Sequence, residues 1–176
     1  CWVPATGKTV LFDYPPAVHL AKHLETIGDI RLARIWTYFS AGDRYEERVV
    51  TWADELADVI RETAPGNTRI AADHLDMLGG KALEDRGFSV HNGQEVMERA
   101  RSIKNDEELK AMLIAISVCE AGMAKMQQEM RAGITENQLW SHLHQVNIAM
   151  GGEWIETRLL ASGGRTNPWF RESSDR

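Results

Sequence analysis

The chain has 176 residues, of which 26% are charged and 43% hydrophobic, and 26 acidic against 20 basic side chains give a net charge of −6. This composition is near the globular average and excludes a disordered, collagen-like or disulfide-scaffold protein. The acidic balance disfavours nucleic-acid binding, because neutralising many phosphates needs a basic face. No apolar run approaches the roughly 18 residues of a membrane span. We therefore expect no nucleic acid and no membrane as partners, and a cytoplasmic location.

The first residue is Cys rather than Met, so we expect a processed or partial chain, in which a missing start would hide any signal peptide. Two cysteines are too few and too far apart for a disulfide framework or a zinc ribbon. Cys119 falls within an apolar helical stripe, where we expect a buried, unreactive thiol.

The first hundred residues alternate strand-like and helix-like segments. Residues 10–12 predict a strand, and residues 17–27 predict a helix that Gly28 closes as its C-cap. A second strand is predicted over 30–36. Residues 46–63 predict a stronger helix with one apolar face, and a strand over 69–72, a helix over 75–86 and a strand over 88–90 follow. This βαβαβ order predicts an α/β fold whose mostly parallel or mixed sheet is covered by helices.

The pattern changes near residue 100, where we place a domain boundary. Asn105 and the acidic residues after it predict the start of a helix. Apolar residues then recur at intervals of three and four from Leu109 to Met130, and Gly133 ends the helix. Thr135 and Gln138 predict a capping box for a further helix. Residues 158–162 predict a strand that leads into a turn-rich loop.

Few residue patterns point to chemistry on their own. His19 and His23 have the spacing of two metal ligands on one helix face, but no acidic third ligand is evident, and we interpret them as solvent-facing. No nucleophile elbow or phosphate-binding glycine motif occurs. The run 151–172 gathers polar and aromatic residues around a short apolar stretch, where binding residues tend to lie. These residues alone leave open whether the run belongs to a site or is a structural connection.

Three stretches together resemble the M24 metallopeptidase family, which has the pita-bread fold of creatinase, prolidase and Xaa-Pro aminopeptidase. They are Arg101-Ser102-Ile103-Lys104 with the acidic residues 106–108, the turn AGITE at 132–136, and the run 151–172. The resemblance implies that residues 1–100 form a creatinase-type N-terminal α/β domain whose start is missing. Residues 101–176 would be the first helices and strand of an α+β pita-bread catalytic domain whose remainder is missing.

The same resemblance implies one or more divalent metal ions of unspecified identity, held by aspartate, histidine and glutamate ligands that come after Arg176. We therefore expect no catalytic residue, no metal ligand and no activity in this chain alone. The family resemblance also implies a homodimer in the full-length protein.

The run 151–172 indicates a branch of the family. Laid without gaps against creatinase-like members, Phe170 stands where they have a substrate-contacting histidine, and phenylalanine cannot transfer a proton. The run is similar instead to the dimethylsulfoniopropionate lyase branch, whose β-elimination releases dimethyl sulfide and acrylate, although Gly164 replaces a common proline. A sulfonium cation suits an aromatic wall. The substrate-pocket candidates are Trp154, Arg165, Trp169 and Phe170.

Two other functions stay open at this point. One is an Xaa-Pro dipeptidase or aminopeptidase. With this alternative and the lyase both open, we expect the substrate to be a small molecule or a dipeptide. The other is a binding module of the same fold that has lost its metal ligands.

Overall fold

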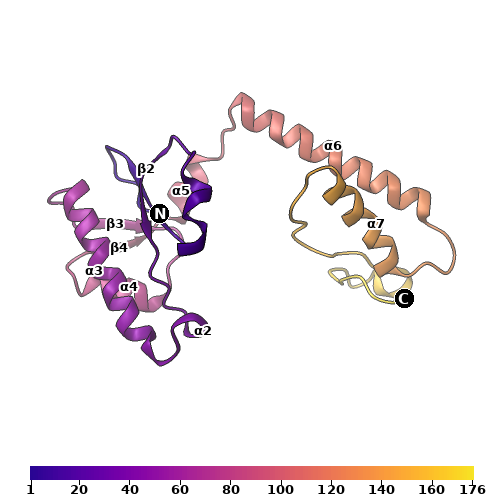
Figure 1. Cartoon of the computed structure of the whole chain (residues 1–176). Helices are drawn as coiled ribbons and strands as arrows, with labels where there is room; N and C mark the ends of the chain where they lie inside the picture. The colour runs from indigo at the N-terminus through magenta and orange to yellow at the C-terminus, as the bar shows by residue number, and fades with distance from the viewer. The chain divides into compact units, whose positions relative to one another are not determined.

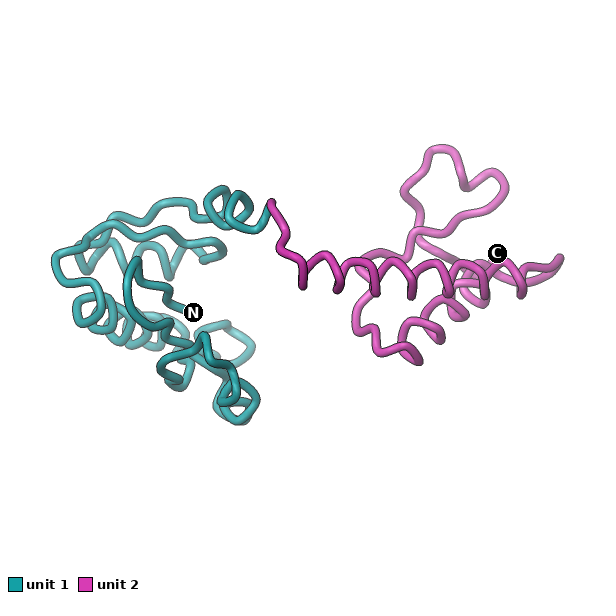
Figure 2. The backbone as a smooth tube through the Cα atoms, turned by 90° about the horizontal axis from the view of Figure 1, so that it is seen from above, with its two compact units in different colours: residues 1–102 teal, residues 103–176 magenta.

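A computed structural model describes residues 1–176, which form two units, Cys1–Ser102 and Ile103–Arg176 (Figure 2). The first unit holds all four strands, and the second is built on the helices α6 and α7 (Figure 1). None of the helices combines the length and the apolar character that crossing a membrane requires.

The first unit alternates strands with helices. In chain order its elements are β1 (Thr9–Asp13), the 3-10 turn η1 (Pro15–Ala17), α1 (Val18–Ala21), β2 (Ile27–Leu32), α2 (Tyr38–Ala41), the 3-10 turn η2 (Gly42–Arg44), α3 (Tyr45–Thr63), β3 (Arg69–Ala72), α4 (Met77–Glu84), β4 (Ser89–Asn92) and α5 (Gln94–Ala100). β1 pairs with β2 and β3 pairs with β4, both in parallel. The predicted α/β class with parallel strands is therefore confirmed.

The strands form two separate two-stranded sheets, whereas the sequence predicted one sheet. Part of the reason lies at the start of the chain. Trp2 bridges to Val10 of β1 in the antiparallel sense through two backbone hydrogen bonds of 2.8 and 2.9 Å. Those backbone groups of β1 are therefore not available to another strand.

The core of the first unit lies under α3, because apolar residues recur along it at helical spacing. The buried cluster consists of Val49, Ala53, Ala57, Ile60, Ile70, Ala82, Leu83 and Phe88. At its margin the Trp36 and Trp52 rings lie 4.3 Å apart between centroids, and Trp36 Nε1 donates to Asp76 Oδ2 over 2.8 Å. The other carboxylate oxygen of Asp76 caps α4 by accepting from Gly79 N. One aspartate thus joins the start of α4 to the tryptophan pair.

The predicted helix over 17–27 and its C-cap are wrong. Only residues 15–21 are helical, and β2 already begins at Ile27 and ends at Leu32 rather than covering 30–36. Gly28 lies inside β2, where a Cβ atom would collide with the side chain of Lys8. The glycine is therefore needed for a close approach of two extended segments. The short helices α2 and α5 were not predicted.

The second unit contains α6 (Asp106–Glu129), α7 (Glu136–Ala149) and the 3-10 turn η3 (Gly163–Arg165). Both predicted helix starts are confirmed as complete capping boxes, Asn105 with Glu108 and Thr135 with Gln138. The helices pack where Gly122 of α6 meets Leu143 of α7, since a Cβ on Gly122 would collide with the Leu143 side chain.

Two expectations for the second unit are wrong. Residues 158–162 do not form a strand, because their only ladder contact is an isolated antiparallel bridge between Leu159 and Glu172. Cys119 is exposed rather than buried. The buried positions of α6 are Val118 and Gly122, so Cys119 lies beside the face that α7 covers and not within it.

The core of the first unit predicts that replacing two leucines of α4 by alanine lowers the free energy of unfolding by different amounts. Leu83 is 1% exposed and Leu78 is 43% exposed. We expect Leu83→Ala to lower the free energy of unfolding by about 2–5 kcal/mol, because it leaves a cavity. The matched change Leu78→Ala is expected to cost about 1 kcal/mol or less. Urea unfolding followed by tryptophan fluorescence measures both, and equal losses would contradict this description of the core.

Candidate functional site

The side chain of Glu136, the first residue of α7, organises the end of the chain. Its carboxylate is buried, with the residue only 4% exposed. Oε1 accepts hydrogen bonds from the backbone N–H and the hydroxyl of Ser162, over 2.6 and 2.7 Å. Oε2 accepts from Nη1 of Arg165 over 2.6 Å, and from the hydroxyl and backbone N–H of Ser174 over 2.7 and 3.1 Å. The carboxylate therefore holds the loop 162–174 against the start of the helix.

Arg165 is the cation of this cluster. Besides Glu136, its Nη1 also contacts the hydroxyl of Ser174, and its Nη2 donates to the backbone carbonyl of Glu172 over 2.7 Å. The Arg165 side chain is 19% exposed. The structure thus places this predicted pocket residue inside the base of the loop, where its guanidinium binds protein groups.

The backbone at the start of α7 contacts the same loop. Glu136 N donates to the carbonyl of Arg176 over 2.8 Å, and Asn137 N donates to the carbonyl of Ser174 over 3.0 Å. The Asn137 side chain accepts from the hydroxyl of Ser173 over 2.7 Å. The first N–H groups of a helix have no partner within it. Here the last residues of the chain supply that partner.

The hydrogen bonds lower the pKa of Glu136 to about 2, from an ordinary value of 4.5. The Ser162 hydroxyl contributes most and the Ser174 hydroxyl next, while burial opposes them; the Ser162 backbone N–H and the charge of Arg165 lower the pKa further. A carboxylate that is ionised far below neutral pH, with both oxygens accepting hydrogen bonds, is a poor general base. Its geometry suits holding the loop in place.

The outer part of the loop is aromatic. The rings of Trp169 and Phe170 meet edge to face, with centroids 5.0 Å apart and planes at 89°. The two residues are 74% and 68% exposed. Phe170 has a φ of 74°, a left-handed conformation that costs a bulky residue about 1–3 kcal/mol. The structure therefore brings together two of the four predicted pocket residues on the exposed side of the loop.

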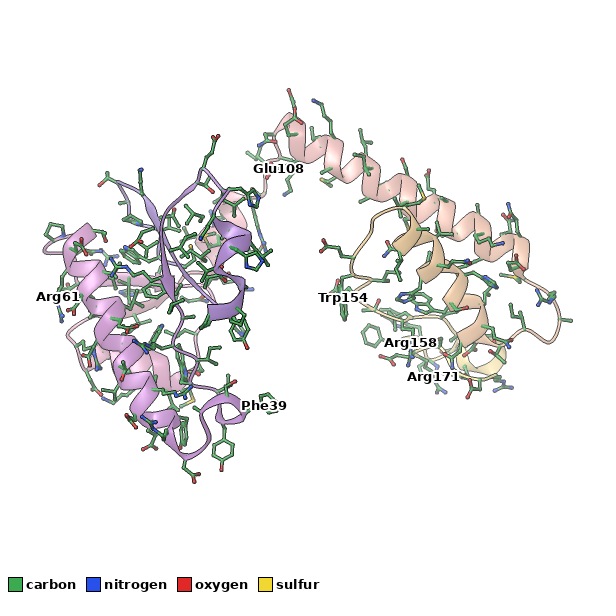
Figure 3. The ribbon with its side chains drawn as sticks, viewed as in Figure 1. Phe39, Arg61, Glu108, Trp154, Arg158 and Arg171 are labelled. Atoms are coloured by element: carbon green, nitrogen blue, oxygen red, sulfur yellow. The ribbon has the colours of Figure 1, made fainter.

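Trp154 lies between the end of α7 and the loop 162–174, and it is 82% exposed. Figure 3 shows its side chain, with those of Arg158 and Arg171, on the C-terminal part of the second unit. Arg158 pairs with Glu172 over 3.0 Å beside the Leu159 bridge. Trp154 makes no ring contact with Trp169 or Phe170 in this structure.

The residues of this chain do not form a metal centre. No group of three or more His, Cys, Asp and Glu side chains lies close enough together to hold an ion. His19 and His23 are both exposed, as interpreted from the sequence. The helix α1 ends at Ala21, so the two imidazoles do not share one helix face as the spacing alone would allow.

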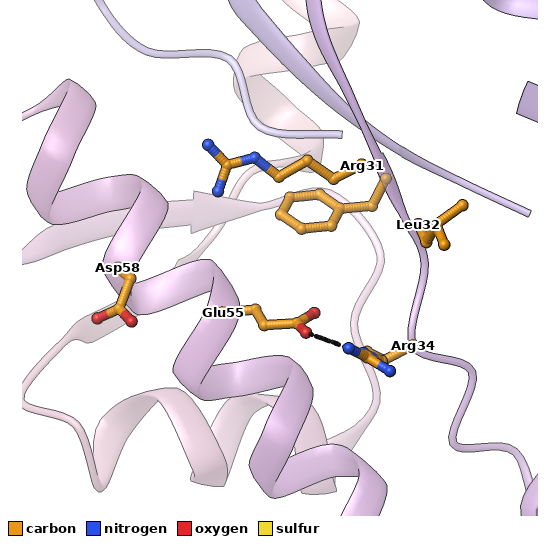
Figure 4. A pocket seen from close by; sticks show the side chains of 6 residues that line it. Arg31, Leu32, Arg34, Glu55 and Asp58 are labelled. Carbon is orange, nitrogen blue, oxygen red and sulfur yellow. Dashed lines mark hydrogen bonds and ion pairs between the residues drawn. The ribbon is translucent and has the colours of Figure 1, made fainter. Parts of the chain in front are cut away.

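Two grooves of the first unit were not predicted. One, of about 280 Å³, is lined by Phe12, Arg31, Leu32, Arg34, Glu55 and Asp58 (Figure 4). The other, of about 550 Å³, shares Arg34 with it. Their charged residues come from the β2 region on one side and from η2 and α3 on the other, and these segments are apart in the sequence. No local motif marks them, because only the tertiary fold brings them together.

Comparison with known proteins finds two curated relatives. Over 177 residues the chain is 40% identical to dimethylsulfoniopropionate lyase DddP of Roseobacter denitrificans, an alignment of 98% of this chain and 40% of that protein. Over 179 residues it is 38% identical to the protein of the same name in Roseovarius nubinhibens, covering 99% of this chain and 40% of the relative. No protein-family model matches the chain. The predicted similarity to dimethylsulfoniopropionate lyases is confirmed, and the chain spans about 40% of the length of these relatives.

The lowered pKa of Glu136 predicts an acid-sensitive second unit. Because the folded-state pKa lies near 2 and the ordinary value is 4.5, the ionised carboxylate stabilises the fold fully above about pH 4.5. That contribution is lost as the pH falls from about 4.5 through about 2. We expect Glu136→Gln to be less stable than the wild type at neutral pH and the difference to narrow over this range. Urea unfolding at a series of pH values measures it.

The matched control is Glu120→Gln, which removes an exposed carboxylate of α6. It is expected to keep the wild-type stability and the wild-type acid response. A stability difference between Glu136→Gln and the wild type that stayed constant from pH 7 to pH 2 would contradict the linkage.

Proposed function

We propose that this chain is the N-terminal part of an M24-type enzyme that acts as a dimethylsulfoniopropionate lyase in its full-length form. In this proposal residues 1–100 are a creatinase-type N-terminal domain and residues 101–176 begin a pita-bread catalytic domain. The observation that carries it is 40% and 38% identity to two lyases of that name over nearly all of this chain.

The proposed reaction is a β-elimination. A base removes a proton from the carbon next to the substrate carboxylate, and those electrons form the double bond of acrylate. The carbon–sulfur bond breaks, and its electron pair leaves with dimethyl sulfide. In this proposal the base and any divalent metal ion belong to the rest of the full-length protein, as the resemblance to the M24 family implies.

The residues of this chain would contribute to substrate binding. A cation over an aromatic face gains about 0.5–2 kcal/mol, and the substrate carries a sulfonium cation. Trp169 and Phe170 offer two adjacent exposed rings on a loop whose base is held by Glu136. The left-handed backbone of Phe170 supports this role, since strained residues cluster at ligand sites.

Arg165 has a different part in this proposal. Its guanidinium bonds to Glu136, Ser174 and the Glu172 carbonyl, so it would position the aromatic loop without binding the substrate carboxylate itself. The aromatic rings would then form the binding surface, and the buried ion pair would hold them in place.

The full-length protein provides the test. We expect it to release dimethyl sulfide from dimethylsulfoniopropionate, measured by headspace gas chromatography. Trp169→Leu should raise KM about 2- to 30-fold with little change in kcat, which is the loss of one cation–π contact. Trp169→Phe keeps an aromatic face and should raise KM less.

Two failures are distinguishable in this experiment. Cleavage of Xaa-Pro dipeptides without dimethyl sulfide release would overturn the lyase function. Normal dimethyl sulfide release with an unchanged KM in Trp169→Leu would overturn only the role of the aromatic loop.

A further inference from the structure

The larger groove of the first unit has the size of a small-molecule site. Its volume of about 550 Å³ lies within the usual range of roughly 300–1,000 Å³. Its walls come from the β1–η1 corner, the chain after β2, and the turn from α2 into α3. Its charged lining residues are Arg34, Arg44, Glu47 and Arg48.

Two of the three arginines in this groove already have a carboxylate. Arg44 binds both oxygens of Glu47, through Nε over 2.9 Å and Nη2 over 2.8 Å. Arg34 binds Glu55 over 2.8 Å, the pair drawn in Figure 4 at the edge of the neighbouring groove. These pairs leave the charge of the third arginine unbalanced.

Arg48 is that third cation. It is half-buried, and its Nη1 donates only to the backbone carbonyls of Ile35 and Ser40, over 3.3 and 3.5 Å. A guanidinium has five N–H donors, so most of its capacity for hydrogen bonds is unused by protein groups. Arg48 also helps to lower the pKa of Glu47, after the larger effect of Arg44. Two guanidinium groups therefore act on one carboxylate, and this corner of the groove carries a positive charge.

Two further acids of this region, Asp43 and Glu46, lie outside the groove lining. Asp43 accepts a hydrogen bond from the hydroxyl of Tyr38, and Glu46 accepts one from the hydroxyl of Tyr45. Neither acid lines the groove. An anionic ligand would therefore meet Arg48 as its main charged partner.

We propose that this groove binds a small organic monocarboxylate with an apolar body, whose carboxylate pairs with Arg48. A carboxylate matches the planar fork of a guanidinium in two parallel hydrogen bonds. One unbalanced cation suits a single negative charge, whereas the second charge of a phosphate dianion would have no cation of the groove to pair with, because Arg44 and Arg34 already bind Glu47 and Glu55. Tyr14, Pro15 and Ile35 supply apolar surface for the rest of the ligand. The site lies in the first unit and does not rest on the lyase function.

Titration of the whole chain with sodium benzoate tests the proposal. Backbone amide chemical shifts measured by NMR should change at the groove residues and saturate. Arg48→Gln should raise the Kd for benzoate about tenfold or more, since it removes a charged hydrogen-bonding partner. The matched control is Arg61→Gln, an arginine of the same helix that pairs with Asp58 and does not line this groove. It should leave the Kd unchanged.

A second variant keeps the proposal testable if Arg48→Gln does not fold. Tyr14 is 56% exposed, so the Tyr14→Ala variant should fold normally. It should raise the Kd for benzoate more than the Kd for acetate, because only benzoate contacts the apolar wall. Equal benzoate affinity in the wild type and Arg48→Gln would overturn the proposal, as would equal weakening by Arg61→Gln. Saturable binding of inorganic phosphate without binding of benzoate would overturn the choice of a carboxylate.

Discussion

The buried carboxylate of Glu136 is the constraint on which the second unit depends. A charged group cannot stay buried without donors, because its lost hydration costs several kcal/mol. The capping box uses the side chains of Thr135 and Gln138, so the Glu136 side chain is available for the loop. Ser162, Arg165 and Ser174 supply the donors. The start of α7 and the loop therefore fix each other, although 26 to 38 residues separate them.

This constraint divides the loop into two parts with different properties. At its base, polar groups are buried and bonded to one another, which leaves Arg165 engaged with protein. On its outer side, Trp169 and Phe170 are exposed and contact each other. A loop that is held at the base and apolar on its outer side can present rigid rings to a ligand, and rigid aromatic groups lose little entropy when they bind.

The sequence predicted well those features that depend on neighbouring residues. Each capping box involves two residues within a stretch of four, and the range of β3 follows from a short apolar run. Gly28 was misassigned because its role depends on Lys8 across the sheet. The ion pair between Glu136 and Arg165 spans 29 residues of sequence. Its one local signal is an acidic residue directly after a helix cap, and that position is favourable for any surface helix through the dipole.

Each of the two units is stabilised internally by a different kind of interaction. In the first unit, side chains such as Ile60 and Leu83 are almost fully buried in one apolar cluster. In the second, Val118 and Leu139 are the buried apolar residues, and much of the apolar stripe of α6, including Leu113 and Met123, is exposed. The hydrophobic effect scales with buried apolar area, so it contributes less to the second unit. The order of its loop therefore depends more on the hydrogen bonds that Glu136 accepts than on apolar burial, and hence on the charge state of a single carboxyl group.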